Sequence, residues 1–239
     1  MNIKYHGIEP FTLLDYPGEL ACILFTNGCN YRCPYCYNAS LVNGTAPPPL
    51  DDESVIGFLQ SRKGKLKAVV FSGGECTLQG DKLEKDVDFV RSLGYKVKVD
   101  TNGSNPELIE RLIKNNKLDY VALDIKCPPG AKEKLFFTYD GLYDKMLDTL
   151  RILMESNIKY EVRTTVHPDV IDENDINDII FMLEKRKYRG KYFIQFFFAA
   201  PETVGNVDPN PRRFKTELVK PYDGLTIGYR NKADNDKRT

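Results

Sequence analysis

Residues 20–38 read Leu-Ala-Cys-Ile-Leu-Phe-Thr-Asn-Gly-Cys-Asn-Tyr-Arg-Cys-Pro-Tyr-Cys-Tyr-Asn, an apolar run followed directly by a cysteine-rich loop. The apolar part, Leu20–Thr26, is short, contains β-branched and aromatic residues, and ends at an Asn-Gly pair, which predicts a buried β-strand. The loop after it contains Cys29, Cys33 and Cys36. The stretch therefore predicts a strand that delivers three thiols to one end of a sheet.

The C-x3-C-x2-C spacing of these thiols favours a four-iron cluster, which normally takes four protein thiolates and would here have one iron open. An open iron indicates catalysis more than electron storage. Zinc is the alternative, but a closed zinc site is usually built from two paired units. Only one C-x2-C pair is present, and the two histidines, His6 and His167, are isolated. Three further cysteines stand alone and are expected to be small buried hydrophobes: Cys22, Cys76 and Cys127.

The composition indicates one large domain and excludes several classes of function. The chain has 239 residues, and Lys plus Arg equals Asp plus Glu at 34 each, so no net field attracts nucleic acid or an anionic membrane. The longest apolar run, around Phe196–Ala200, is far too short to span a membrane, and no charged leader precedes an apolar stretch. We therefore expect a cytoplasmic protein, with neither nucleic acid nor membrane as partner, in a compartment that keeps thiols reduced.

Apolar runs alternate with helical patterns along most of the chain, which is typical of repeated βα units around a parallel sheet. Six strands are predicted, at residues 20–26, 68–72, 96–101, 120–126, 160–166 and 192–198. Helix caps are expected at Asp51 or Asp52, at Asn105 and at Asp172. The predicted fold class is α/β, a partial (β/α)6 TIM-type barrel with parallel strands over residues 1–205. Residues 206–239 are expected to form a C-terminal extension that ends in a disordered tail.

Polar residues gather where the predicted strands end. Ser72-Gly73-Gly74-Glu75 ends the second strand, Asp100-Thr101-Asn102-Gly103 the third and Asp124-Ile125-Lys126 the fourth, while Arg163 and Gln195 lie on the fifth and sixth. A Gly-Gly-Glu alone is most often a turn, but five polar clusters at corresponding strand ends are hard to assign to chance. The carboxyl ends of the strands form the active face of a βα barrel, so an active site is expected there.

With its cysteine motif, the aromatic Tyr35, the Gly-Gly-Glu and the Asp-Ile-Lys, the chain resembles the radical S-adenosylmethionine (SAM) enzymes. Within them it is most similar to the activases of glycyl radical enzymes. The resemblance covers residues 1–205. The stretches Phe11–Gly18 and Leu24–Asn30 look especially like the activating proteins of anaerobic ribonucleoside-triphosphate reductases.

This resemblance implies a cofactor pair and a role for each motif. Cys29, Cys33 and Cys36 would hold a 4Fe–4S cluster whose open iron binds SAM, and one electron would split SAM into methionine and a 5′-deoxyadenosyl radical. Glu75 would accept a hydrogen bond from the methionine ammonium group. The glycines before it, Gly73 and Gly74, would let the backbone approach that group, because a Cβ atom would obstruct it.

The remaining cofactor contacts that the resemblance implies come from the cysteine loop and from the ends of the later strands. Tyr35 is placed for the adenine with Tyr37 beside it, and Asn102 either reaches the ribose or caps a turn. Three residues are expected near the cofactor carboxylate and a monovalent cation: Asp100, Thr101 and Asp124. Lys126 and Arg163 would balance negative charge there; the alternative for Asp124 and Lys126 is a plain ion pair at a strand end.

Two positions depart from the family pattern. Many activases have His-Asn after the third cysteine, where this chain has Tyr37-Asn38, and Gly-Gly-Glu is usually followed by Pro, where this chain has Cys76. Neither change removes a cluster ligand or the carboxylate. Cys76 is either a reactive thiol or a packing residue.

The leading hypothesis is an activase that abstracts a glycine Cα hydrogen and so installs a glycyl radical on a partner, an anaerobic ribonucleotide reductase. A low-potential flavodoxin or ferredoxin would supply the electron. The open side of an incomplete barrel would admit an extended loop of the partner and bring its glycine within near-attack distance. One alternative is a radical SAM enzyme that acts on a small molecule or a nucleoside. The other is a non-catalytic binding protein stabilised by zinc.

Overall fold

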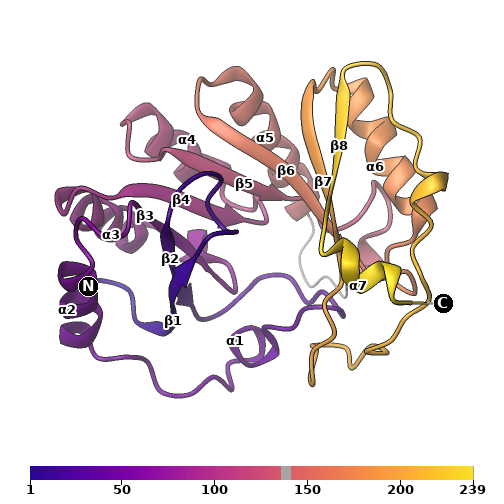
Figure 1. Ribbon diagram of the computed structural model, residues 1–239. Coiled ribbons are helices and arrows are strands. Elements are labelled where there is room, and N and C mark those ends of the chain that lie inside the picture. The colour runs from indigo at the N-terminus through magenta and orange to yellow at the C-terminus, as the bar shows by residue number, and fades with distance from the viewer. Residues whose placement is uncertain (136–140, 239) are drawn as a thin grey trace. The chain divides into compact units, whose positions relative to one another are not determined.

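The computed structural model describes residues 1–135 and 141–238, and within them eight strands form one open sheet in chain order (Figure 1). The strands are β1 (Tyr5–Thr12), β2 (Ala21–Thr26), β3 (Ala68–Gly73), β4 (Lys96–Thr101), β5 (Tyr120–Asp124), β6 (Lys159–Val166), β7 (Gly190–Phe196) and β8 (Leu225–Arg230). The register is parallel for β2 with β3, β3 with β4, β6 with β7 and β7 with β8. The predicted α/β class with parallel strands is confirmed, and all six predicted strands are present.

Helices occupy most of the connections between these strands. They are α1 (Ala39–Asn43), α2 (Asp52–Ser61), α3 (Asp81–Ser92), α4 (Pro106–Lys114), α5 (Leu142–Glu155), α6 (Glu173–Lys185) and α7 (Lys232–Asp236), with short 3-10 turns η1 (Cys76–Gln79), η2 (Lys132–Leu135) and η3 (Thr216–Leu218). The predicted caps are confirmed, because the side chains of Asp51, Asn105 and Asp172 accept hydrogen bonds from the first turns of α2, α4 and α6. In the described part of the chain, no helix is long and apolar enough to cross a membrane.

Two strands lie outside the six that the sequence pattern predicts. β1 precedes them and runs antiparallel to β2, with register shifts on either side of its central pairs. It contains Gly7 and Pro10 and is half exposed, so its sequence carries little of the alternation that marks a strand. β8 follows them and pairs with β7, although it begins only a few residues after Pro221 and contains Gly228.

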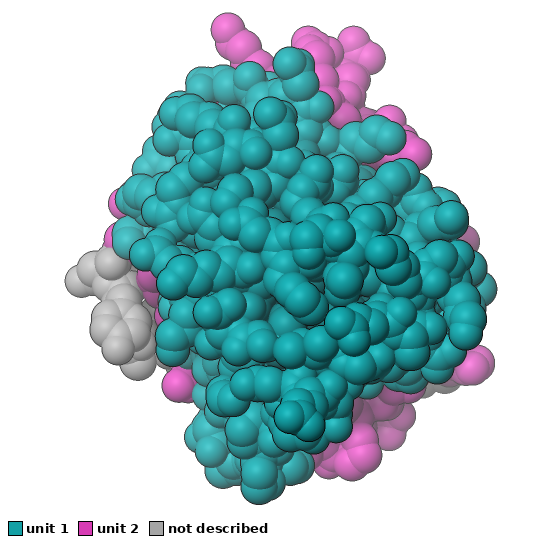
Figure 2. Space-filling model, turned by 90° about the vertical axis from the view of Figure 1, so that its left-hand side faces the viewer, with its two compact units in different colours: residues 1–29, 40–122, 145–160 teal, residues 30–39, 123–144, 161–239 magenta. Residues whose placement is uncertain are grey.

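The chain divides into two compact units, shown in different colours in Figure 2: residues 1–29, 40–122 and 145–160 form unit 1, and residues 30–39, 123–144 and 161–239 form unit 2. In unit 1, the central strand β3 is fully buried from Ala68 to Phe71, as a strand covered on both faces should be. On one of those faces, Ile23 of β2 lies beside Val70 of β3, and Tyr16 packs against both strands.

In unit 2, the segment after β7 is ordered by contacts with the sheet. Phe196 of β7 lies against Phe214, and it stacks on Tyr229 of β8 at a centroid distance of 5.8 Å. The side chain of Asn235 in α7 accepts a hydrogen bond from the Phe214 amide at 2.8 Å and donates one to its carbonyl at 3.1 Å. The fully buried Asn235 thus anchors α7 to the chain before β8.

Candidate active site

Glu75 is a buried carboxylate that joins the carboxyl ends of β3 and β4 in unit 1. Its side chain is 1% exposed. Oε1 accepts hydrogen bonds from the amide and hydroxyl of Thr77 at 3.1 and 2.5 Å and from the Thr101 hydroxyl at 2.8 Å, while Oε2 accepts the Asn102 amide at 2.7 Å. Burial raises the pKa of Glu75, and these four hydrogen bonds oppose the rise. The carboxylate thus fixes the two strand ends to each other.

The two glycines before Glu75 are required by the packing of the backbone. A Cβ atom on Gly73 would lie 2.3 Å from the backbone N and O atoms of Thr26, and one on Gly74 would lie 2.0 Å from the Gly28 carbonyl oxygen. Gly73 also has a φ of +122°, which side chains rarely adopt. The sequence prediction that these positions need glycine holds, but the obstacle is the loop after β2. These backbone contacts alone explain why both positions require glycine.

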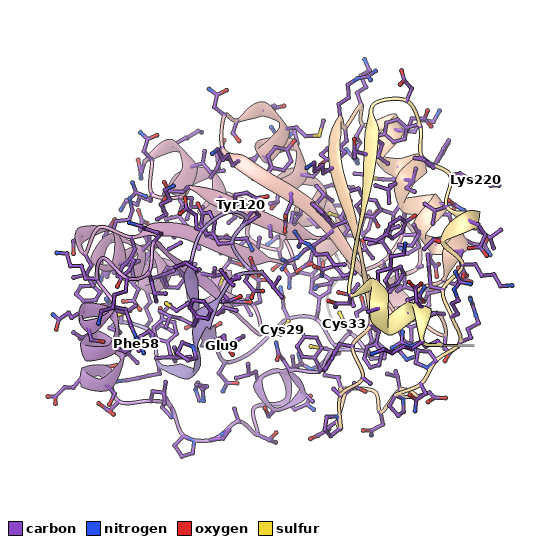
Figure 3. The ribbon with its side chains drawn as sticks, viewed as in Figure 1. Glu9, Cys29, Cys33, Phe58, Tyr120 and Lys220 are labelled. Carbon is purple, nitrogen blue, oxygen red and sulfur yellow. The ribbon has the colours of Figure 1, made fainter. Side chains whose placement is uncertain are left out.

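Cys29 follows β2 in unit 1, on the loop that these glycines contact (Figure 3). The Asn102 side chain amide donates a hydrogen bond to Cys29 Sγ at 3.9 Å. The Oδ1 atom of Asn102 accepts the Ser104 amide at 3.0 Å, so the side chain also caps the turn after β4. Of the two expectations for Asn102, the turn cap is confirmed, and contact with a ribose stays a prediction.

Asp100 has a partner that the sequence analysis missed. Lys98, two residues earlier on β4, is completely buried, and its ammonium group lies 2.5 Å from Asp100 Oδ1. The same ammonium lies 5.8 Å from the centre of the Tyr120 ring. The strict alternation from 96 to 100 places Lys98 and Asp100 on one face of the strand, and this signal would have revealed the pair.

Cys76 is a packing residue. Its side chain is fully buried, and Sγ lies 3.5 Å from the carbonyl oxygens of Phe71 and Asp100. Burial, with the neighbouring Glu75 carboxylate, raises the pKa of the thiol well above its ordinary value. The possibility of a reactive thiol at this position is therefore not supported. Cys22 and Cys127 are buried as expected.

The other two cysteines of the motif belong to unit 2, where Cys33 is labelled in Figure 3. Cys33 is 6% exposed, and its carbonyl accepts the Cys36 amide at 3.0 Å, which closes a turn between them. The segment after β7 holds this turn, because the Val204 amide donates to the Cys36 carbonyl at 3.0 Å. Between the cysteines, the buried hydroxyl of Tyr35 donates to the Lys126 carbonyl at 3.0 Å.

A chain of alternating charges runs along the ends of β5 and β6 in unit 2. Arg163 Nε lies 2.8 Å from Asp124 Oδ1, and Lys126 Nζ lies 3.2 Å from Oδ2. Burial opposes ionisation of Asp124, but Arg163 and Lys126 outweigh burial and lower the pKa of its carboxyl group. The ion pair that the sequence analysis gave as an alternative is therefore present.

Two members of this network were missed from the sequence. Glu161 lies 3.6 Å from Arg163 and accepts two hydrogen bonds of 2.8 Å from Arg230 of β8. Glu161 precedes Arg163 by two residues, so the strand period already places both on one face. Arg230 also donates to Gln195 at 3.2 Å, but only the pairing of β8 reveals its position. Tyr37 stands apart, with 59% of its surface exposed.

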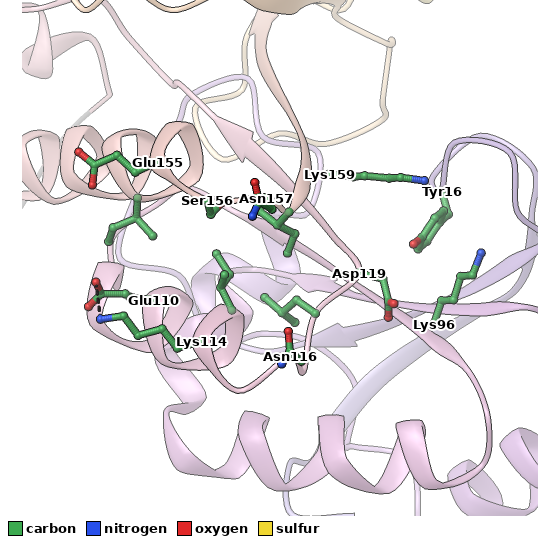
Figure 4. Close-up of a pocket in the computed structure, with 14 residues that line it drawn as sticks. Tyr16, Lys96, Glu110, Lys114, Asn116, Asp119, Glu155, Ser156, Asn157 and Lys159 are labelled. Carbon is green, nitrogen blue, oxygen red and sulfur yellow. Dashed lines mark ion pairs between the residues drawn. The ribbon is translucent and has the colours of Figure 1, made fainter.

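A separate pocket of about 680 Å³ opens in unit 1 (Figure 4). It lies at the amino ends of β4 and β6, where Lys96 and Lys159 line it, and at the carboxyl ends of α4 and α5. Its acidic and basic side chains largely pair with each other or with neighbours, as Lys114 does with Glu110. Its lining within the described chain includes none of the predicted site residues. It is therefore distinct from the candidate site, which lies at the opposite, carboxyl ends of the strands.

Each unit thus brings together part of the predicted site. Unit 1 contains Cys29, Gly73, Gly74, Glu75, Asp100, Thr101 and Asn102. Unit 2 contains Cys33, Tyr35, Cys36, Tyr37, Asp124, Lys126 and Arg163. Apart from Arg163, which lies inside β6, these residues belong to strand ends or to loops that follow a strand, where a βα fold places its active site.

Comparison with known proteins shows the family of the chain. The model of the radical SAM superfamily matches residues 23–185. A Methanocaldococcus jannaschii protein assigned to the glycyl-radical enzyme activating enzymes is 38% identical over 186 residues, which cover 75% of each chain. The pyruvate formate-lyase-activating enzyme of Clostridium pasteurianum is 32% identical over 184 residues, which cover 72% of each chain.

Solved structures show the same fold. Streptococcus suis SuiB bound to S-adenosylmethionine matches 85% of this chain with a TM-score of 0.58 and 13% identity. Native anSMEcpe with bound AdoMet matches 72% of it with a TM-score of 0.54 and 19% identity. The match covers 48% of each of those longer chains.

The fold, the cysteine motif and these matches define a radical SAM enzyme, and the chain belongs to that superfamily. Within it, the chain belongs with the glycyl-radical enzyme activating enzymes. The family implies a 4Fe–4S cluster and SAM. The residues present fit the cluster in donor chemistry, because clusters of this kind are held by cysteine thiolates. Burial raises the pKa of the Cys36 thiol, while a hydrogen bond from the Asn38 backbone and the nearby Lys126 oppose the rise.

Proposed function

We propose that this chain installs a glycyl radical on a partner enzyme, and that the partner is an anaerobic ribonucleotide reductase. The observation that carries the proposal is the 38% identity to the M. jannaschii activating enzyme over 75% of both chains. The choice of a reductase rests on the stretches Phe11–Gly18 and Leu24–Asn30, which resemble the activating proteins of those enzymes.

Cys29, Cys33 and Cys36 are the residues that would hold the 4Fe–4S cluster. When bound, the cluster and SAM supply the chemistry: one electron from a low-potential flavodoxin or ferredoxin cleaves SAM to methionine and a 5′-deoxyadenosyl radical, which takes the glycine Cα hydrogen and leaves as 5′-deoxyadenosine. Three cysteine ligands leave one iron for SAM. The other residues of the site would position SAM.

In unit 1, Glu75 would accept a hydrogen bond from the methionine ammonium of SAM. Support comes from Oε2, which accepts one hydrogen bond from the protein, whereas a carboxylate oxygen has two lone pairs. Asp100 and Thr101 would bind a monovalent cation near the SAM carboxylate. Both already have protein partners, Lys98 for Asp100 and Glu75 for Thr101, so any cation would share them.

In unit 2, Lys126 and Arg163 would balance the SAM carboxylate. With Asp124, Glu161 and Arg230 they form a network of three positive and two negative charges, which leaves one positive unit in excess. Tyr35 would contact the adenine from its buried position, and the exposed Tyr37 would border the opening. The Tyr35 hydroxyl is already held by the Lys126 carbonyl, which would fix the ring for stacking.

Cofactor chemistry is tested after anaerobic reconstitution with iron and sulfide. We expect a brown protein that releases 5′-deoxyadenosine from SAM in the presence of dithionite. C33A should lose both the colour and the product. C22A should retain them, since Cys22 is buried in β2 and lies outside the motif. A colourless protein with stoichiometric zinc would refute the proposal in favour of a zinc-stabilised binding protein.

The partner is identified by electron paramagnetic resonance after incubation with candidate enzymes. We expect a glycyl radical doublet in an anaerobic ribonucleotide reductase, and no doublet when its radical glycine is replaced by alanine. Pyruvate formate-lyase is the second candidate, because its activating enzyme in C. pasteurianum is 32% identical to this chain. A doublet only in that enzyme would overturn the choice of a reductase. SAM cleavage without a doublet in any glycyl radical enzyme would instead indicate a small-molecule or nucleoside substrate.

A further inference from the structure

The Asn102 side chain is held at both of its polar ends in unit 1. Nδ2 donates to Cys29 Sγ at 3.9 Å, and Oδ1 accepts the Ser104 amide at 3.0 Å. The backbone is fixed as well, because the Asn102 amide donates to Glu75 Oε2 at 2.7 Å. With only 3% of its surface exposed, Asn102 has little freedom to turn its amide away from the sulfur.

A hydrogen bond to a ligating sulfur changes the redox properties of an iron–sulfur cluster. Reduction adds negative charge, part of which resides on the sulfur atoms, so an N–H donor stabilises the reduced state more than the oxidised state. The effect is strengthened by burial, since water does not compete with the donor. A donor at Cys29 therefore raises the reduction potential of a cluster bound there.

We propose that Asn102 is a positioning residue that holds the Cys29 sulfur and raises the reduction potential of the cluster, which makes reduction by a low-potential donor protein easier. The inference rests on the proposed function, since it requires Cys29 to ligate a 4Fe–4S cluster. It gives Asn102 a role in electron delivery that does not depend on contact with SAM.

The test compares N102S with N105S, two matched variants in the same loop. A serine hydroxyl can still accept the Ser104 amide at position 102, but it is too short to reach Cys29. At position 105, serine still caps α4 by accepting the Leu108 amide, and only the hydrogen bond from Asn105 Nδ2 to the Thr77 carbonyl is lost. Each variant thus loses one amide donor and keeps one acceptor, with no change of charge.

The measurement is an anaerobic redox titration of the reconstituted proteins without SAM, followed by the electron paramagnetic resonance signal of the reduced cluster. We expect a lower midpoint for N102S, with about a tenfold smaller ratio of reduced to oxidised cluster at the wild-type midpoint, equivalent to about 59 mV for one electron. N105S should titrate like the wild type. Iron content and thermal melting are measured on the same samples.

Each outcome bears on one claim. If the wild type assembles a cluster and N102S titrates at the wild-type midpoint, the inference is wrong while the proposed function stands. The inference also fails if N102S and N105S shift equally, since the effect would then come from the loop as a whole. If the wild type assembles no cluster, the proposed function itself fails.

Discussion

Replacement of Lys98 by Met removes one partner of a buried ion pair and keeps the length of the side chain. Lys98 is completely buried and Asp100 has only 10% of its side chain exposed, so water cannot replace the lost ammonium. Breaking such a pair from one side costs about 3–5 kcal/mol, because a charge stays buried without its partner. Part of this cost is offset, since Met packs well against the apolar face that Val70 shares with position 98. We expect K98M to lower the free energy of unfolding by about 3 kcal/mol.

The assay is urea unfolding of K98M, D100N and the double variant K98M/D100N, with the slope checked for equality among the proteins. D100N should be comparably destabilising, since it leaves the Lys98 ammonium buried beside a neutral amide. The double variant should be more stable than the sum of the single effects predicts, because it removes both charges together. K96M is the control: Lys96 lies on the same strand and also pairs with an acid, Glu19, but it is half exposed and should matter little.

The reasoning is refuted if K98M unfolds at the same urea concentration as K96M. It is also refuted if K98M and D100N are strictly additive in the double variant. Either result would mean that the Lys98 ammonium reaches water in solution and that Asp100 does not depend on it.

Two further predictions concern one position in each unit. G74A should destabilise the protein by about 1–3 kcal/mol or more, because its Cβ would lie 2.0 Å from the backbone oxygen of Gly28. The control G57A lies in the interior of α2 with open space around it and should raise the melting temperature, so equal melting shifts of the two variants would contradict this prediction. Burial opposes ionisation of Glu173, but its hydrogen bonds, chiefly with Arg212, outweigh burial and lower the pKa from 4.5 to about 2. The ionised Glu173 therefore stabilises the folded protein above pH 4.5, and this stabilisation is lost as the pH falls toward 2. E173Q should therefore show a flatter loss of unfolding free energy across this interval, and a slope as steep as that of the wild type would count against the ion pair.

The strands were predictable because their apolar and β-branched residues form either a continuous run, as in β2 and β3, or a regular alternation with polar residues, as in β4. β4 (Lys96–Thr101) occupies the predicted residues, and β2 and β3 differ from their predictions by one residue. β1 and β8 escaped because they are half exposed and contain glycine, with a proline in β1, so tertiary pairing decides their conformation. The sheet topology, rather than local propensity, makes them strands.

The candidate site was predictable as a set of positions and less so as a set of contacts. Once the strands are predicted, the residues at their ends are known as well, so the positions of Glu75 after β3 and of Asp124 at the end of β5 could be predicted. What each side chain contacts depends on atoms that the sequence separates widely, such as Arg230 and Glu161, which are 69 residues apart. The roles of the glycines changed for the same reason: the pattern required Gly74, but only the position of the Gly28 carbonyl explains why.

The contacts of Glu75 explain why two variants in unit 1, G74A for stability and N102S for the reduction potential, are not independent. Its amide donates to the Gly28 carbonyl at 2.8 Å, next to Cys29, and its carboxylate accepts the Asn102 amide at 2.7 Å. Glu75 therefore helps to position both Cys29 and Asn102, whose side chain amide donates to the Cys29 sulfur. Because Glu75 is buried and its carboxylate accepts four hydrogen bonds from η1 and the end of β4, its position is set mainly by the ends of β3 and β4. The Gly-Gly-Glu turn is thus the structural base of the cysteine loop as well as a candidate contact for SAM.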